Sequence, residues 1–171
     1  MGSFIVSSIR RRNLLRQLER MSYRDQLTQF GNRYAVDWFV EHEWNGEQIG
    51  VVYCDITGLK KVNDEQGHEA GDRLIIRACE CLAGVFKGYG LYRIGGDEFL
   101  VLCLGIEEKD LREHVEKLHM DMKEHQVTMA VGMIWKEHGP KDIDLLLNES
   151  ERLMYEDKDR YYKEHGLKRR R

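Results

Sequence analysis

The chain has 171 residues, of which 42% are hydrophobic and 33% are charged, and its formal net charge is −3. This size and balance indicate one globular domain with a substantial core and exclude a disordered chain. The slight negative charge gives no general attraction to nucleic acid or anionic lipid, so we expect no nucleic-acid partner.

Cysteine and histidine usage argues against a zinc centre. None of the four cysteines belongs to a Cys-x-x-Cys pair, three lie in apolar runs, and no His-Glu-x-x-His occurs. Such cysteines are typical of reduced core thiols, and zinc ligands usually follow tighter spacing rules. Because free thiols are typical of reducing compartments, we expect a cytoplasmic protein.

The N-terminal segment predicts an amphipathic helix over residues 5–21, because Leu14, Leu18 and Met21 recur at helical spacing. We treat residues 1–22 as this helix and residues 23–171 as the main domain. The helix either packs on its own domain or ends a coiled-coil stalk from an upstream domain. An apolar run at residues 4–9 precedes three arginines. This arrangement is also compatible with the cytoplasmic end of a membrane helix, which would tether the domain to the inner face of the membrane.

The main domain predicts alternating helices and strands. The dense β-branched run at residues 49–56 predicts a central strand with Asp55 at its carboxyl end, where ligand sites in such sheets gather. Strands are also expected at residues 91–102, as a hairpin, and at 126–135. Helices are expected near residues 34–40, 59–66, 69–86, 107–124 and 143–162. This order indicates an α/β fold with a central mixed β-sheet flanked by helices.

The hairpin carries the most informative residues. Gly95 and Gly96 separate two apolar runs and predict a tight turn, because glycine enters positive φ without steric cost. Asp97 and Glu98 follow, at the start of an apolar run without alternation that predicts a strand buried on both faces. A core strand that begins with two carboxylates indicates a bound cation, such as a divalent metal with a phosphate ligand. A solvated acidic turn is the alternative.

The residues alone therefore favour a metal-dependent phosphate or nucleotide site. If the strands of Asp55 and Asp97 are neighbours, their like charges repel unless a metal neutralises them. Two metals held by such acids can activate a hydroxyl nucleophile and stabilise a phosphate leaving group. Lys60 and Lys61 follow Asp55 and could meet phosphate charge. The sequence contains neither a P-loop motif nor a Gly-x-Gly-x-x-Gly that opens a helix.

Five blocks in order resemble the GGDEF family, the diguanylate cyclase domains. The blocks extend from about residue 23 to residue 158 and comprise the pentad Gly95-Gly96-Asp97-Glu98-Phe99, Arg93 ahead of it, Asp25 to Arg33, Asp55 to Asp72, and Met154-Tyr155 with Lys158. The resemblance implies a palm-like fold akin to nucleotidyl cyclases. It also implies condensation of two GTP into cyclic di-GMP with magnesium, or manganese, in a homodimer whose two half-sites face each other. An upstream sensory or membrane domain would control this dimer.

The resemblance also implies roles for individual residues. The metal ligands would be Asp55, the carbonyl of Ile56, Asp97 and Glu98. The catalytic residues would be Asp97, Glu98 and Lys60. The substrate-binding residues would be Asn63 and Asp72 on the guanine edge, with Gly95, Gly96, His68 and Lys158 also at the substrate.

Departures from the family pattern keep a second interpretation open. Thr57 and Gly58 stand where the family often has Asp and Phe, and Tyr162 replaces a common basic phosphate contact. These changes leave room for a catalytically idle domain that binds GTP and passes on a signal. Feedback-inhibited members carry Arg-x-x-Asp where this chain has Phe86 to Tyr89, so we expect no such product site. The small size and acidic balance argue against a polymerase palm.

Overall fold

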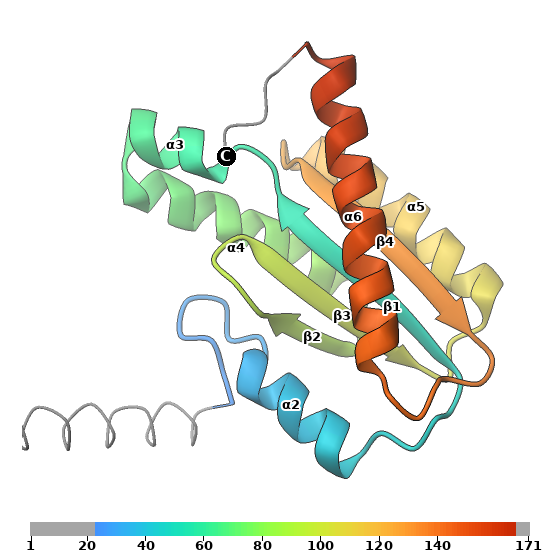
Figure 1. The fold of residues 1–171 in the computed structure, drawn as a ribbon. Helices are drawn as coiled ribbons and strands as arrows, with labels where there is room; N and C mark the ends of the chain where they lie inside the picture. The colour runs from blue at the N-terminus through green and yellow to red at the C-terminus, as the bar shows by residue number, and fades with distance from the viewer. Residues whose placement is uncertain (1–22, 167–171) are drawn as a thin grey trace, which may run out of the picture.

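The structure is a computed structural model that describes residues 23–166. The expected helix at residues 5–21 lies outside the described residues, and the domain boundary there stays a prediction. Figure 1 shows the described part as a sheet with helices packed on both faces. In chain order the elements are α2 (Arg33–His42), β1 (Ile49–Ile56), α3 (Leu59–Gln66), α4 (His68–Val85), β2 (Gly90–Arg93), β3 (Glu98–Leu104), α5 (Glu108–Glu124), β4 (Met129–Lys136) and α6 (Asp144–Glu164).

The sheet has the strand order β2-β3-β1-β4, and each neighbouring pair is antiparallel. The expected α/β fold with a central sheet between helices is confirmed, but the expectation of mixed pairing is wrong for these strands. The physical reason is the order of the strands. Strands β1 and β2 run in the same direction, as do β3 and β4, because helices connect them. Within each of these two sets another strand lies between the members, so they do not hydrogen-bond to each other. A parallel contact occurs as an isolated bridge between Gly31 and Tyr92.

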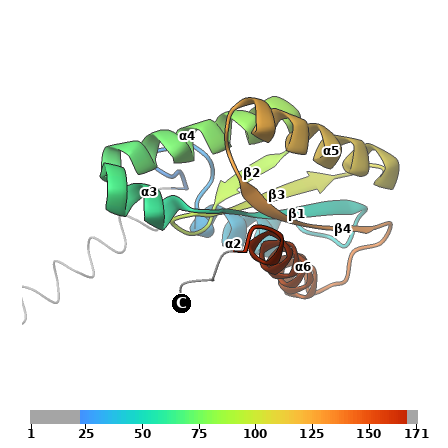
Figure 2. The same ribbon diagram turned by 90° about the horizontal axis from the view of Figure 1, so that it is seen from above.

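Two hydrophobic cores lie on opposite faces of the sheet, and β1 is buried along its whole length between them. Figure 2 shows α4 and α5 covering one face and α2 and α6 covering the other. Val52, Cys54 and Ile56 of β1 pack in the first core, whereas Val51 and Tyr53 pack in the second. Because successive strand residues face opposite sides, Asp55 belongs to the face that α6 covers.

Helix α6 packs directly on the backbone of β4 because residue 132 is glycine. A Cβ atom at Gly132 would lie 2.0 Å from the carbonyl oxygen of Ser150 and 2.3 Å from the backbone nitrogen of Met154. Both atoms belong to the helix backbone, which cannot rotate away as a side chain can. Gly132 therefore sets the distance between α6 and the sheet.

The structure bears on two further expectations, one for the cysteines and one for the hairpin. All four cysteines are buried and unpaired, as predicted for core thiols. Between residues 23 and 166, no helix has the length and apolar character needed to cross a membrane. The hairpin also forms where expected, although Asp97 belongs to the turn and β3 begins at Glu98.

Candidate functional site

Two carboxylates meet where β1 ends and β3 begins. Asp55 is 4% exposed and lies directly opposite Glu98 in the antiparallel register of the two strands. Residues opposite each other in a sheet point to the same face, so both side chains lie on the side of α6. The backbone N–H of Ile56 donates to the carbonyl of Asp97 over 2.8 Å, which fixes the turn to the end of β1. The expectation that these acids come from neighbouring strands is correct.

The environment of Glu98 is strongly acidic. Burial raises the pKa of Glu98 above its usual value, and the charges of Asp97, Asp55 and Glu151 raise it further, while Lys158 opposes them. The turn glycine makes room for this carboxylate, because a Cβ atom at Gly95 would lie 2.5 Å from Glu98 Oε2. The site therefore concentrates negative charge in a partly buried place, where a cation would be favoured.

Lys158 reaches this cluster from α6. Its Nζ donates to Asp55 Oδ1 over 2.6 Å, and the two side chains are only 14% and 5% exposed. The family resemblance places Lys158 on terminal phosphates, whereas the structure pairs it with a proposed metal ligand. Glu98 lies close enough for Lys158 to lower its pKa.

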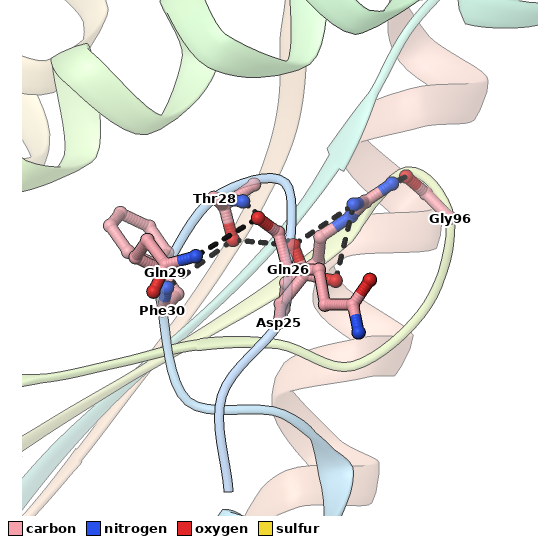
Figure 3. Close-up of polar contacts among 7 residues, drawn as sticks. Asp25, Gln26, Thr28, Gln29, Phe30 and Gly96 are labelled. Carbon is pink, nitrogen blue, oxygen red and sulfur yellow. Dashed lines mark hydrogen bonds and ion pairs between the residues drawn. The ribbon is translucent and has the colours of Figure 1, made fainter. Parts of the chain in front are cut away.

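Arg93 joins the glycine turn to the first motif of the domain. Its guanidinium donates to the Gly96 carbonyl over 2.7 Å and to Asp25 Oδ1 over 3.1 Å. Asp25 also accepts from the backbone N–H and the hydroxyl of Thr28, at 2.9 and 2.8 Å. Figure 3 shows Asp25 and Thr28 facing each other beside the turn that carries Gly96. The sequence identified these residues as motif members, and their positions give them a role in holding the turn.

The hydrogen bonds around Asp25 affect its protonation. Burial alone would raise the pKa of Asp25, but the hydrogen bonds from Thr28 and the charge and hydrogen bond of Arg93 outweigh it. The pKa therefore lies below its usual value of 3.8. The carboxylate form is the one that holds the turn.

The proposed guanine-binding residues lie together at the α3–α4 junction. Gly67, with φ of 85°, ends α3 and precedes α4. A Cβ atom at Gly71 would lie 1.8 Å from Asn63 Oδ1, so the Asn63 amide rests on the backbone of α4 at Gly71, the residue before Asp72. The sequence shows Gly71 only as part of the Asp55 to Asp72 block, and its contact with Asn63 required the three-dimensional structure. Lys60 and His68 are exposed on the same two helices.

The positions that depart from the family pattern have distinct surroundings. Within the described residues, the buried hydroxyl oxygen of Thr57 has no hydrogen-bond partner. Gly58 has φ of 85°, a conformation that a phenylalanine would adopt only with strain. Thr57 also borders a groove of ≈ 570 Å³ beside the start of β4 and the C-terminal parts of α5 and α6.

Aromatic residues occupy the positions expected for a product-inhibition motif. Phe86 is fully buried, and its ring centroid lies 5.6 Å from that of His114. Tyr89 contacts the same histidine edge-on at 6.1 Å. Phe86 and Tyr89 have aromatic rings, whereas the Arg-x-x-Asp motif needs a guanidinium and a carboxylate to bind the product. That this domain has no product-inhibition site stays our prediction.

The donor set suits a magnesium ion that shares its coordination with a phosphate. Between residues 23 and 166, no group of three or more His, Cys, Asp or Glu side chains is arranged to hold a metal. Magnesium usually binds proteins through one or two carboxylates and completes its shell with water and substrate phosphates. Asp55, Asp97 and Glu98 provide hard oxygen ligands of this kind at one end of the sheet. Asp55 and Glu98, which lie opposite each other on the two strands, could contribute oxygen ligands to such an ion.

The family model described as "Diguanylate cyclase, GGDEF domain" matches residues 22–163. The chain therefore belongs to the GGDEF domain family. It is 30% identical over 152 residues to diguanylate cyclase DgcP of Escherichia coli, covering 80% of this chain and 45% of that protein. It is 29% identical to MucR of Pseudomonas aeruginosa, a bifunctional diguanylate cyclase and cyclic di-GMP phosphodiesterase, covering 92% of this chain and 25% of that protein. The chain thus spans less than half the length of these relatives.

The fold is also that of solved members of the family. The coiled coil and GGDEF domain of DgcB from Caulobacter crescentus, crystallised with cyclic di-GMP, aligns with a TM-score of 0.71 at 20% identity. The alignment covers 97% of this chain and 93% of that one. At this identity the likeness establishes the fold, and the chemistry has to be argued from the site.

Proposed function

We propose that this domain is a diguanylate cyclase that condenses two GTP molecules into cyclic di-GMP. The observation that carries the proposal is the buried Asp55 directly opposite Glu98, beside the glycine turn. Burying carboxylates together is costly unless a cation compensates them. Lys158 compensates part of this charge, and we attribute the acidity that remains around Glu98 to a catalytic metal site.

In this proposal, Asp55, Asp97, Glu98 and the carbonyl of Ile56 hold magnesium, with manganese as an alternative. When bound, the ion would neutralise phosphate charge and make the attacking 3′-hydroxyl more acidic. The carboxylates of Asp97 and Glu98 would assist removal of the hydroxyl proton.

The remaining residues bind and orient the substrate. Asn63 and Asp72 would form hydrogen bonds with the guanine edge, and the packing of the Asn63 amide on Gly71 brings it to the helix that carries Asp72. Lys60 would stabilise charge on the transferring phosphate. Gly95, Gly96, His68 and Lys158 would contact the rest of the nucleotide. A Cβ at Gly96 would meet open space, so a phosphate can approach the backbone of the turn closely there.

One site holds one GTP, so the reaction requires two copies of the domain facing each other. The homodimer would orient the two substrates for mutual attack, which supplies much of the rate enhancement in reactions between two bound molecules. Residues 1–22 and a sensory or membrane domain upstream would control this encounter. Since GTP is a cytoplasmic substrate, we place the domain on the cytoplasmic side, free or tethered to the membrane.

A catalytically idle, GTP-binding signal-relay domain is the second candidate. It is favoured by the unpartnered Thr57 hydroxyl where the family often has an acid, and by Tyr162 where a basic phosphate contact is common. Such a domain would bind GTP through Asn63 and Asp72 without forming a product.

Nucleotide chromatography after incubation with GTP and magnesium tests the two candidates. A cyclase should form cyclic di-GMP at a rate that rises faster than linearly with protein concentration, because two copies must meet. The Asp55→Asn variant should lose this activity, whereas Asp37→Asn, a change of the same kind on the exposed face of α2, should keep it. GTP binding without any product at the highest protein concentration would reject the cyclase in favour of the idle domain.

A further inference from the structure

Lys158 lies where a cation is needed, on the carboxylate that the proposed function gives to magnesium. Its Nζ is 2.6 Å from Asp55 Oδ1, and 103 residues separate the two in the chain. Both side chains are largely withdrawn from solvent, at 14% and 5% exposure. A lysine this close to a buried carboxylate is a specific ion pair and not a solvated surface contact.

The contact has a clear electrostatic reason. The charges of Asp97, Asp55 and Glu151 act on Glu98 as like charges, and Lys158 acts on it in the opposite direction. A buried carboxylate without a partner is strongly disfavoured. Lys158 therefore compensates the buried acid of β1 in the protein without metal.

At this position the Lys158 ammonium competes with a metal ion for Asp55. Magnesium sits about 2.0–2.1 Å from its oxygen ligands, which is closer than the ammonium is to Asp55 Oδ1. Two cations on one carboxylate oxygen repel each other, more strongly where solvent is excluded. A metal that binds either oxygen of Asp55 therefore lies close to the Lys158 ammonium and must displace it or bear the repulsion between the two cations.

Helix α6 provides a way for the displaced ammonium to be used. A lysine has four rotatable methylene units, so Nζ can leave Asp55 while the helix stays in place. In the proposed function, the nearest new negative charge is the phosphate chain that arrives with the metal. The ammonium would then exchange a carboxylate for a phosphate without becoming unpaired.

We propose that Lys158 is a resident counter-cation that disfavours binding of metal alone and favours binding of metal together with a nucleotide triphosphate. The inference rests on the proposed function, because Asp55 must be a metal ligand. It predicts positive coupling between the two ligands. Any coupling of this kind is reciprocal, so metal strengthens nucleotide binding by the same factor.

The test measures Mn²⁺ binding to the purified chain by electron paramagnetic resonance of the free ion, with no nucleotide present. The Lys158→Met variant, which keeps side-chain length and removes the charge, should bind Mn²⁺ about 3- to 10-fold more tightly than the wild type. Lys163→Met removes a charge from an exposed position of the same helix and should leave the affinity unchanged. With a non-hydrolysable GTP analogue present, the advantage of Lys158→Met should vanish or reverse.

An unchanged or weaker Mn²⁺ affinity in folded Lys158→Met, without nucleotide, would overturn the inference. If that variant does not fold, Lys158→Gln is measured in its place, and an Mn²⁺ affinity without nucleotide that is equal to or weaker than that of the wild type rejects the coupling. Neither measurement requires turnover. A protein that forms no cyclic di-GMP but shows the Lys158 effect would refute only the cyclase, and an active enzyme without the effect would refute only the counter-cation.

Discussion

Replacing Gly71 with alanine should damage nucleotide binding while leaving folding almost untouched. Gly71 is buried in the first turns of α4, and its missing Cβ is the space that the Asn63 side chain occupies. An added Cβ would lie 1.8 Å from Asn63 Oδ1 and 2.8 Å from Asn63 Cγ. Real atoms do not approach this closely, so the Asn63 amide must turn away from its place against Gly71.

The stability effects of this change nearly cancel. Alanine is more favourable than glycine inside a helix by about 0.5–1 kcal/mol, since it restricts the unfolded chain. Forcing Asn63 from a preferred rotamer costs about 0.5–1.5 kcal/mol. The net change in the free energy of unfolding should therefore stay within about 1 kcal/mol, and the melting temperature should move by only a few degrees.

The binding effect has no such compensation. If Asn63 hydrogen-bonds the guanine edge, its displacement removes one or two bonds worth about 0.5–1.5 kcal/mol each. A loss of about 1.4 kcal/mol weakens binding tenfold. Titration calorimetry with a non-hydrolysable GTP analogue should show this loss in Gly71→Ala, while circular dichroism shows a normal melting curve.

A second glycine of the same helix provides the control. A Cβ at Gly84 would have Asp121 Oδ2 at 3.8 Å as its nearest neighbour, which is an ordinary contact. Gly84→Ala should therefore gain helix stability and bind the analogue normally. Because Gly71→Ala acts through Asn63, the double variant with Asn63→Ala should bind no worse than Asn63→Ala alone. Wild-type affinity in Gly71→Ala, or fully additive losses in the double variant, would refute the reasoning.

Three further predictions follow from other contacts. Arg93→Gln should lower the free energy of unfolding by about 1–3 kcal/mol in urea titrations, because it breaks the half-buried pair with Asp25. The lowered pKa of Asp25 adds stability that is complete above pH 3.8 and is lost as the pH falls through the folded-state pKa, so acid unfolding curves of the wild type and Arg93→Gln should converge at low pH. Gly132→Ala should destabilise the domain by about 3 kcal/mol or more in thermal melts, because its Cβ meets helix backbone. Tyr162→Arg should tighten binding of the GTP analogue about 3- to 10-fold in calorimetry, by restoring a basic phosphate contact; an unchanged affinity would show that Tyr162 does not face the triphosphate.

The sequence predicted the parts of the site that depend on local signals. The glycine pair between two apolar runs marks the turn, and the absence of alternation after Glu98 marks a strand buried on both faces. Asp55 is found because it ends a dense β-branched run. These signals lie within a few residues of one another, so they do not depend on how the rest of the chain packs.

The sequence could not predict contacts between distant segments. The antiparallel sheet depends on β3 being inserted between β1 and β2, and β1 between β3 and β4. Hydrophobic patterns predict that strands exist but do not determine which strands pair. The contact of Lys158 was unpredictable for the same reason. Its sequence neighbours are charged helix residues, and its partner Asp55 is 103 residues away.

Glycines within elements show why the unpredicted contacts matter for the site. In sequence, Gly71 and Gly132 only weaken the prediction of a helix and a strand. In the structure, the first admits the Asn63 amide and the second admits the backbone of α6. Since α6 carries Lys158, any increase in the α6–β4 distance at Gly132 withdraws the ammonium from Asp55. The charge compensation of Asp55 therefore depends on Gly132, which has no side chain and lies on the edge strand β4. If Gly132→Ala folds, it should change the Mn²⁺ affinity in the same direction as Lys158→Met.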